Sequence, residues 1–300
     1  MVYILTNAKA THANQTDFQE KIATLFAGKE YTICEIPPET EYHTFFADKH
    51  PEDEFVLVGG DGTLNRFACA MGDTPIRHKI YLYKAGNGND FLRDIYDMEA
   101  PDNTLMQVND YLQDLPSVTV NGTDYRFINN VGFGIDGMVC TKGIEAADKG
   151  ETNINYAGIA IKCMFTCYKP CNAIVKVDGK EYAFKKVWLA PAMNGRYYGG
   201  GMKIAPEQDR KGDTISVVIF HDTGKLQTLM IFPKIFKGTH VRYKKHITVL
   251  SGHHITVTFD KPQDIQIDGE VIRDVTTYTA VKEALPAQPK ELKDHETAAF

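Results

Sequence analysis

Over the first 115 residues or so, short apolar runs alternate with segments of helical spacing. The runs predict strands at 2–6, 31–35, 54–58 and 80–83, and the spacing predicts helices near 17–26, 42–48 and 64–71. Strands that alternate with helices are typical of a parallel, doubly wound sheet, in which ligands bind beyond the carboxyl ends of the strands. We therefore expect an α/β domain over residues 1–116.

Beyond Pro116 the pattern changes to short alternating strands joined by Asp-Gly turns. These strands are expected at 117–120, 125–128, 173–177, 182–189, 214–220, 246–250, 254–259, 264–267 and 276–281. One helical stretch, roughly 155–168, interrupts them. The pattern predicts an antiparallel β-sandwich over residues 117–285, followed by a polar tail over 286–300.

A glycine-rich turn follows the buried strand at 54–58 and precedes the predicted helix at 64–71. Its sequence is Gly59-Gly60-Asp61-Gly62-Thr63. Glycines let the backbone approach a ligand closely, and the start of a helix presents N–H groups that suit phosphate. A carboxylate at Asp61 would repel phosphate unless a cation lay between them, so the turn indicates a metal-bound nucleotide. Turn geometry alone is the simpler alternative.

A second glycine cluster, Gly86-Asn87-Gly88-Asn89-Asp90-Phe91, follows the strand at 80–83 in the same way. The Walker pattern GxxxxGK[ST] is absent from the sequence. Two strand–glycine–helix units about 25 residues apart therefore predict a phosphate site other than a P-loop.

Four motifs in this order resemble the signature of the diacylglycerol kinase catalytic family. They are residues 59–63 with Asn65, residues 86–91, the segment Gly132-Phe133-Gly134-Ile135-Asp136, and the segment Ile267-Asp268-Gly269-Glu270. That family includes bacterial lipid kinases and the sphingosine and ceramide kinases, and it shares its fold with NAD kinases. The second and fourth motifs favour the lipid kinases over the NAD kinases. The resemblance extends to about residue 285, and in that family the C-terminal segment can return to the first domain.

The resemblance implies an ATP-dependent kinase with Mg²⁺ as cofactor and a lipid hydroxyl, diacylglycerol-like, as acceptor at the membrane surface. The nucleotide-binding positions that it implies are Gly59, Gly60, Asp61, Gly62, Thr63, Asn65, Gly86, Asn87, Gly88 and Asn89. Asp61, Asp90 and Asp136 would organise the metal. Asp268 would act as the base for the acceptor hydroxyl, with Glu270 supporting it or the metal. Asn65 and Asn89 could instead cap a turn or helix.

Local sequence does not distinguish Asp268 from a turn residue. Asp268-Gly269 and Asp178-Gly179 both have the composition that a two-residue type I′ hairpin requires. Only the resemblance selects Asp268 as the base.

Several positions depart from the family pattern. Arg66 and Asn87 stand where the family usually has glutamate and threonine, and Arg66 could contact phosphate or face solvent. Many bacterial members carry a DGxxD loop that binds a structural metal, but here Ser216 replaces one of the expected aspartates. Asp213 is therefore only a weak metal candidate, because hard cations need several oxygen ligands.

Two further motifs have simpler interpretations. Residues 132–137 read literally as GxGxxG, but Gly143 and Gly150 interrupt the helix that a dinucleotide fingerprint requires. Cys163, Cys167 and Cys171 recur every four residues, but Pro170 is expected to end a helix before the third, and no histidine lies within the cluster. We interpret these cysteines as small buried hydrophobes.

The length and composition of the chain are those of an enzyme with two hydrophobic cores. The chain has 300 residues, of which 43% are apolar and 24% charged, and a net charge of −6 argues against a nucleic-acid partner. No apolar run approaches the roughly 18 residues of a membrane span, and the first residues read as a strand rather than a signal peptide. We expect a cytoplasmic protein, peripheral at the inner membrane face, and a homodimer remains open.

One basic-aromatic stretch, residues 232–245, could contact anionic headgroups or simply be a solvated face. Two alternatives to a lipid kinase stay open: a kinase of the NAD kinase type that phosphorylates a soluble hydroxyl, and a non-catalytic relative that binds lipid or nucleotide.

Overall fold

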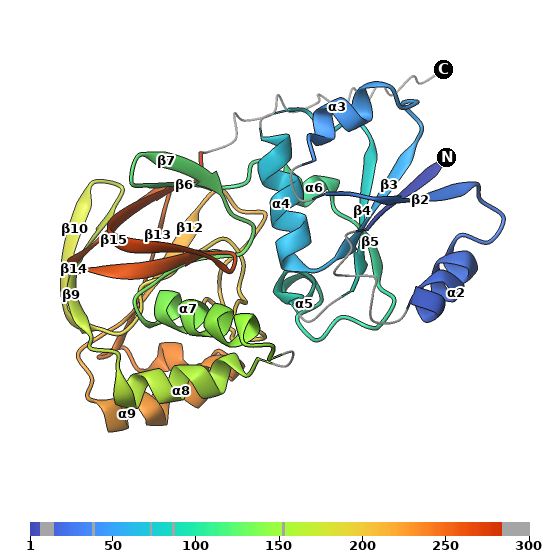
Figure 1. The fold of residues 1–300 in the computed structure, drawn as a ribbon. Coiled ribbons are helices and arrows are strands. Elements are labelled where there is room, and N and C mark those ends of the chain that lie inside the picture. The colour runs from blue at the N-terminus through green and yellow to red at the C-terminus, as the bar shows by residue number, and fades with distance from the viewer. Residues whose placement is uncertain (7–14, 38–39, 73, 86–87, 152–153, 284–300) are drawn as a thin grey trace, which may run out of the picture.

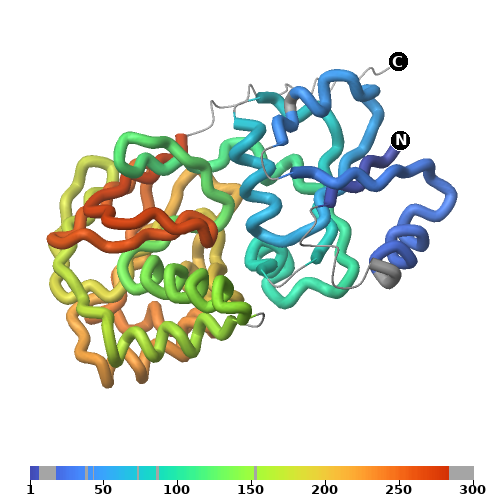
Figure 2. Tube along the Cα trace, in the orientation of Figure 1, coloured from blue at the N-terminus to red at the C-terminus, as the bar shows by residue number. Residues whose placement is uncertain are grey.

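The protein consists of two domains, which Figure 1 shows side by side. The structure, a computed structural model, describes residues 1–6, 15–37, 40–72, 74–85, 88–151 and 154–283. Figure 2 shows the first third of the chain, blue to blue-green, gathered in one body and the remainder, green to red, in the other. The chain passes from the first sheet to the second between residues 112 and 117.

The first domain is a five-stranded sheet in the order β2-β1-β3-β4-β5, with β1 to β4 parallel and β5 antiparallel to β4. Its strands are β1 (Val2–Thr6), β2 (Tyr31–Glu35), β3 (Glu54–Gly59), β4 (Lys79–Lys84) and β5 (Leu105–Gln107). Its helices are α2 (Gln15–Leu25), α3 (Tyr42–Ala47), α4 (Asp61–Met71), α5 (Asp90–Tyr96) and α6 (Asn109–Leu112).

Strand β3 is buried on both faces, which confirms the doubly wound prediction. Phe55 and Leu57 pack in the same core as residues of α3, α4 and α5, whereas Val56 and Val58 pack on the other face with residues of α2. Alternate side chains of a strand point to opposite faces, so a strand covered by helices on both sides must be apolar throughout. The continuous apolar run 55–58 meets that requirement.

The second domain is built on a ten-stranded antiparallel sheet whose main path is β13-β12-β11-β8-β14-β15-β6-β7, with β9 pairing to β14 and β10 to β9. Its strands are β6 (Ser117–Val120), β7 (Thr123–Arg126), β8 (Asn130–Phe133), β9 (Cys171–Val177), β10 (Lys180–Val187), β11 (Ala192–Met193), β12 (Ile215–Phe220), β13 (Ile247–Gly252), β14 (His254–Ile267) and β15 (Glu270–Val281). The antiparallel prediction is confirmed.

Helices cover one side of this sheet, and the sequence pattern predicted only one of them. They are α7 (Ile135–Asp148), α8 (Tyr156–Thr166), α9 (Lys225–Ile231) and the 3-10 helices η1 (Phe232–Lys237) and η2 (Thr239–Arg242). Strand β12 shows why they are needed: Val217 and Ile219 face the inner core, while Val218 and Phe220 pack in a second core with residues of α8, α9 and η1.

The expectation that glycines interrupt a helix after residue 134 is wrong, because α7 runs through Gly137 and Gly143. A side chain at Gly137 would collide with the backbone carbonyl of Asp264 in β14, and one at Gly143 would collide with the ring of Tyr156 in α8. These glycines let α7 pack closely on both neighbours. They favour packing here rather than helix termination.

Candidate active site

The two glycine clusters of the first domain lie against each other at the carboxyl ends of β3 and β4. Gly60 precedes the first residue of α4, and a side chain there would collide with the carbonyl oxygen of Gly88, which also accepts a 2.9 Å hydrogen bond from the Asp61 N–H. Gly62, in the first turn of α4, is exposed and faces open space. A ligand can therefore approach the backbone of this turn without a steric barrier.

Asp61 joins the starts of α4 and α5. Its two carboxylate oxygens accept hydrogen bonds from the N–H groups of Asp90 (2.7 Å) and Phe91 (2.9 Å). Burial raises the pKa of Asp61, while these N–H groups and the nearby charge of Arg210 oppose the rise. The carboxylate that the sequence placed inside a phosphate cradle is thus also the anchor for the second glycine cluster.

Asp90 connects the first domain to a glycine loop of the second. Its carboxylate accepts hydrogen bonds of 2.7 Å from the N–H groups of Gly200 and Gly201. Both glycines have positive φ, 82° and 103°, which a residue with a side chain rarely adopts. Burial, followed by the charge of Asp61, raises the pKa of Asp90 to about 6.

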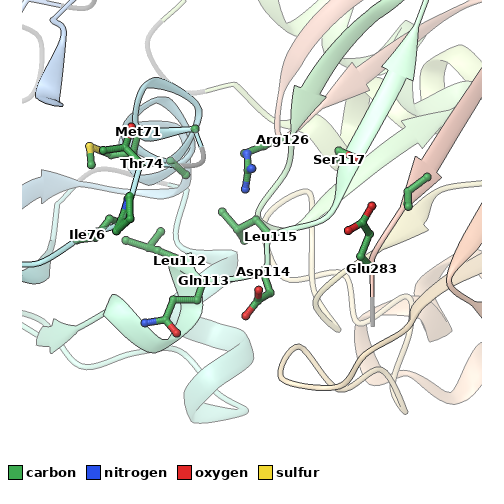
Figure 3. Close-up of a pocket in the computed structure, with 14 residues that line it drawn as sticks. Met71, Thr74, Ile76, Leu112, Gln113, Asp114, Leu115, Ser117, Arg126 and Glu283 are labelled. Atoms are coloured by element: carbon green, nitrogen blue, oxygen red, sulfur yellow. The ribbon is translucent and has the colours of Figure 1, made fainter. Parts of the chain in front are cut away.

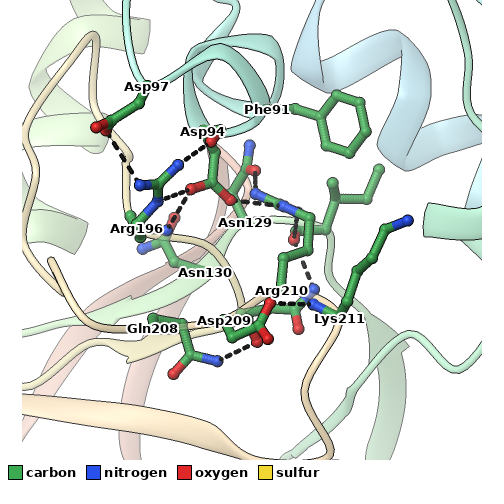
Figure 4. Close-up of polar contacts among 12 residues, drawn as sticks. Phe91, Asp94, Asp97, Asn129, Asn130, Arg196, Gln208, Asp209, Arg210 and Lys211 are labelled. Atoms are coloured by element: carbon green, nitrogen blue, oxygen red, sulfur yellow. Dashed lines mark hydrogen bonds and ion pairs between the residues drawn. The ribbon is translucent and has the colours of Figure 1, made fainter.

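A buried ion network lies next to this contact, and no motif in the sequence indicates it. Asp94 of α5 accepts hydrogen bonds of 2.7 Å from Nε of Arg196 and from Nε of Arg210 (Figure 4). Arg210 also donates a 2.7 Å bond to Oδ1 of Asn129 and lies 4.8 Å over the ring of Phe91. Its hydrogen-bond partners Asn129 and Asp94 are 81 and 116 positions away, so no local motif records them.

Asp268 lies in the turn between β14 and β15 and faces the first domain. Its Oδ1 accepts hydrogen bonds from the N–H groups of Asn129 (2.8 Å) and Asn130 (2.9 Å). Its Oδ2 accepts from the N–H of Ile128 (2.5 Å) and from Nδ2 of Asn65 (2.7 Å). Burial raises the pKa of Asp268 to about 6 against the opposing effect of the three N–H groups, and the charge of Asp61 adds to the rise.

Asn65 points toward Asp268. Besides the bond to Asp268, its amide nitrogen contacts the carbonyl of Arg126 at 3.3 Å. The side chain is 7% exposed. Its predicted contact with nucleotide stays a prediction, whereas its contact with the candidate base is a feature that the sequence did not indicate.

Asp178 occupies a turn of the same geometry away from the domain interface. Asp178 and Asp268 both have φ of 45° and precede a glycine of positive φ. The Asp178 carboxylate accepts bonds from the N–H groups of His253 (3.0 Å) and His254 (2.8 Å). The two aspartates therefore differ in their surroundings rather than in their local conformation.

Asp136 lies in the first turn of the helix α7 and is buried beside Tyr198. Its Oδ1 accepts a 2.8 Å bond from the Tyr198 hydroxyl, and its Oδ2 has no hydrogen-bond partner among the described residues. Burial raises the pKa of Asp136 to about 7. A buried oxygen without a partner is costly, so it marks a place where a polar group of a ligand would be stabilised.

Three other positions that the sequence singled out are exposed. Glu270 and Asp213 are exposed, and Arg66 lies on the exposed side of α4 near Tyr42. Asn89 is buried at the residue preceding α5. Gly86 and Asn87 lie outside the described residues.

The departure at Ser216 has a structural counterpart. Its hydroxyl donates to Oε1 of Gln208 at 2.5 Å and lies 2.8 Å from the hydroxyl of Ser251. Within the described ranges, no three acidic, histidine or cysteine side chains are arranged to hold a metal ion.

The cysteine cluster is divided between two elements. Cys163 is buried in α8, Cys167 is exposed just after α8 ends at Thr166, and Cys171 is buried at the start of β9. All three are free thiols.

A cavity of about 580 Å³ lies at the other end of α4, beside the connection between the domains (Figure 3). It is lined by Met71, Leu115 and Arg126 among others. Neither Asp61 nor Asp268 lines this cavity. We therefore place the candidate active site around Asp61, Asp90 and Asp268 instead.

Comparison with known proteins agrees with this geometry. Residues 1–116 match the family model described as the diacylglycerol kinase catalytic domain, and residues 129–290 match the YegS C-terminal NAD kinase beta sandwich-like domain. The chain belongs to the diacylglycerol kinase family.

Named relatives of this family are distant. A diacylglycerol kinase of Mycobacterium tuberculosis is 25% identical over 197 residues, which are 63% of this chain and 62% of that protein, so less than two thirds of the relative is spanned. A diacylglycerol kinase of Bacillus subtilis is 22% identical over 228 residues, 73% of this chain and 71% of that protein. A solved structure of a diacylglycerol kinase from Bacillus anthracis str. Sterne has a TM-score of 0.66 at 20% identity, covering 94% of each chain. That likeness confirms the fold.

No helix in the described part of the chain is long and apolar enough to cross a membrane.

Proposed function

We propose that this member of a kinase family transfers the γ-phosphoryl group of ATP to the hydroxyl of a diacylglycerol-like lipid at the membrane surface. The observation that carries the proposal is the position of Asp268, a half-buried carboxylate of the second domain that contacts α4 directly behind its glycine-rich first turn. Phosphoryl transfer depends mainly on positioning and charge neutralisation, so a site between two domains suits it.

The first turn of α4 fits a phosphate chain. Gly62 leaves its backbone open, and the positive end of a helix favours negative charge. Asp61, which is half-buried, and Asp90, which is buried, lie beside this turn, and their charges would repel phosphate unless a cation lay between them.

Two carboxylates suit a Mg²⁺ ion that keeps phosphate and water among its ligands, since that ion rarely uses an all-protein cage. Asp61 and Asp90 would hold it. Asp136 lies close by, because Tyr198 donates a hydrogen bond to Asp136 and is also near enough to Asp90 to be affected by its charge. When bound, the ion neutralises charge on the transferred phosphoryl group.

Asp268 supplies a base. A carboxylate offers about four lone-pair positions, and Asp268 accepts four hydrogen bonds in this structure. Three donors are backbone groups, so the Asn65 amide is the donor that can turn away and free Oδ2. The acceptor hydroxyl would then pass its proton to Oδ2 as its oxygen bonds to the γ-phosphorus. The bond from that phosphorus to the bridging oxygen breaks, and ADP leaves.

A labelling experiment tests this function. The protein is incubated with γ-labelled ATP, Mg²⁺ and either extracted lipids or NAD. We expect label in the organic phase with the lipids. Label in NADP would instead indicate a kinase for a soluble hydroxyl, and no label in either phase with nucleotide still bound would indicate a non-catalytic relative.

A further inference from the structure

The helices α8 and α9 present apolar side chains to solvent. The α8–α9 face consists of Tyr156, Ile161, Phe165, Leu226, Met230 and Phe236. Leu226 and Met230 are 73% and 67% exposed, although both belong to a helix that packs on the domain core through Ile231. Figure 1 shows α8 and α9 together at one edge of the second domain.

The two helices pack on one shared core and expose apolar side chains to solvent. Both pack their opposite sides on one core, α8 through Cys163 and Met164 and α9 through Ile231. Nζ of Lys225 donates a 2.8 Å hydrogen bond to the carbonyl of Phe165, which ties the end of α8 to the start of α9. Each helix exposes two apolar residues one turn apart, Ile161 and Phe165 on α8 and Leu226 and Met230 on α9. We therefore treat them as one apolar surface rather than as isolated exposed side chains.

The charge of the two chain segments that contain this face contrasts with that of the whole protein. The segments 154–177 and 223–259 contain no aspartate or glutamate, yet they hold eight lysines and one arginine in a protein of net charge −6. Lys162 and Lys237 are exposed on α8 and on η1, near Ile161 and Phe236 in the chain. Apolar side chains beside basic ones are complementary to an anionic bilayer, where aliphatic groups enter the interface and lysines contact headgroups.

We propose that the α8–α9 face is the surface with which the protein docks on anionic membranes. The inference rests on the proposed function, because a lipid kinase must reach an acceptor that stays in the bilayer. The face is also connected to the site: α8 packs on α7 through Tyr156 against Gly143, and the first turn of α7 carries the buried Asp136. Of the basic-aromatic stretch 232–245, Phe236 belongs to this face, whereas Phe232 is buried.

Vesicle flotation tests the surface. The full chain is mixed with vesicles of phosphatidylcholine alone or with one quarter phosphatidylglycerol, at low and high salt. The variant Leu226→Ser with Met230→Ser removes the most exposed apolar groups. A matched control, Leu25→Ser with Ile33→Ser, removes two side chains that are 40% and 41% exposed on the first domain. We expect the first variant to lose about tenfold or more in affinity for anionic vesicles, and the control to bind like the natural chain.

The charges are tested separately. Lys162→Glu with Lys237→Glu should weaken binding to anionic vesicles by about fivefold or more per lysine, and high salt should weaken binding of the natural chain. Equal binding by the natural chain and the Leu226/Met230 variant would overturn the proposal. So would a dimer in light scattering that this variant converts to a monomer without any vesicle binding, because the face would then be a subunit interface.

A short-chain acceptor separates this inference from the proposed function. With dioctanoylglycerol below its aggregation limit, the Leu226/Met230 variant should keep the activity of the natural chain, while with dioleoylglycerol in anionic vesicles it should lose most of it. If the natural chain labels neither acceptor but its vesicle binding still depends on Leu226 and Met230, the docking surface stands and the proposed reaction fails. If both acceptors are labelled equally by variant and natural chain, the reaction stands and the docking surface fails.

Discussion

Asn65 and Asp268, which lie 203 positions apart, are joined across the domain interface by a 2.7 Å hydrogen bond. A donor to an ionised carboxylate stabilises the charged form, so this bond holds Asp268 ready as a base and also occupies the oxygen that a proton would take. The relationship makes α4 responsible for both ends of the proposed reaction. In the proposed reaction its first turn would face the nucleotide, and its second turn carries the Asn65 amide that contacts the candidate base.

Replacing Asn65 should therefore change the pH dependence of the reaction. Asn65→Ala removes a donor to the charged carboxylate, and the pKa of Asp268, already raised to about 6 by burial, should rise further. We expect the acidic limb of the kcat/KM profile to move to higher pH by roughly one unit. Arg66→Ala, on the exposed side of the same helix, should leave the limb unchanged. An unmoved limb in Asn65→Ala would show that the amide does not act on the base.

Asp136 should make the folded state less stable at alkaline pH. Burial raises the pKa of Asp136 to about 7, so the folded protein binds this proton more tightly than the unfolded chain, whose aspartates titrate near pH 4. The stabilisation from this proton is complete below about pH 4 and is lost as the pH rises through about 7. Asp136→Asn should consequently melt several degrees above the natural chain at about pH 8.5 and close to it at pH 5.

The control for this comparison is Asp213→Asn, because Asp213 is exposed. Its melting temperature should follow that of the natural chain at every pH. A constant difference between Asp136→Asn and the natural chain from pH 5 to 8.5 would contradict the assignment of the titration to Asp136.

Mg-ATP should stabilise the fold through Asp61. A ligand that binds only the folded state raises the melting temperature by mass action, so saturating Mg-ATP should produce a shift of several degrees. Asp61→Ala should lower the melting temperature by itself, since it removes the acceptor for the N–H groups of Asp90 and Phe91, and should also abolish the shift. Asp213→Ala should keep the shift. Retention of the full shift in Asp61→Ala would exclude Asp61 from the nucleotide site.

The sequence predicted those parts of the fold whose cause is local. The apolar run 55–58 followed by glycines predicted β3 and the start of α4, because burial on two faces and a tight turn are both recorded within a few residues. Helix α7 was missed because its glycines serve a long-range contact. Gly137 packs against the backbone of Asp264, which lies more than a hundred positions away in the sequence. Local propensity treats such a glycine as a helix breaker, whereas the packing of the folded chain requires it.

The site divides in the same way. The motifs selected Asp61, Asp90, Asp136 and Asp268 as candidates. The structure brings Asp61 close to Asp90 and to Asp268, so the charge of Asp61 raises the pKa of both. No motif predicted the hydrogen bonds of Asp94 to Arg196 and Arg210. Neither arginine belongs to a recognisable motif, and both meet Asp94 only when the two domains pack together.

The most direct test of the account compares turnover of the Asp268→Asn and Asp178→Asn variants with lipid acceptor and saturating Mg-ATP. Both aspartates have φ of 45° in matching turns, so asparagine should preserve the turn in each variant, and melting curves check that both variants remain folded. Only Asp268→Asn removes the proposed base. We predict a loss of roughly 10²–10⁴-fold in kcat for Asp268→Asn with the Mg-ATP melting shift preserved, and natural turnover for Asp178→Asn. Equal turnover in the two variants would contradict the account and leave Asp268 as a structural turn residue.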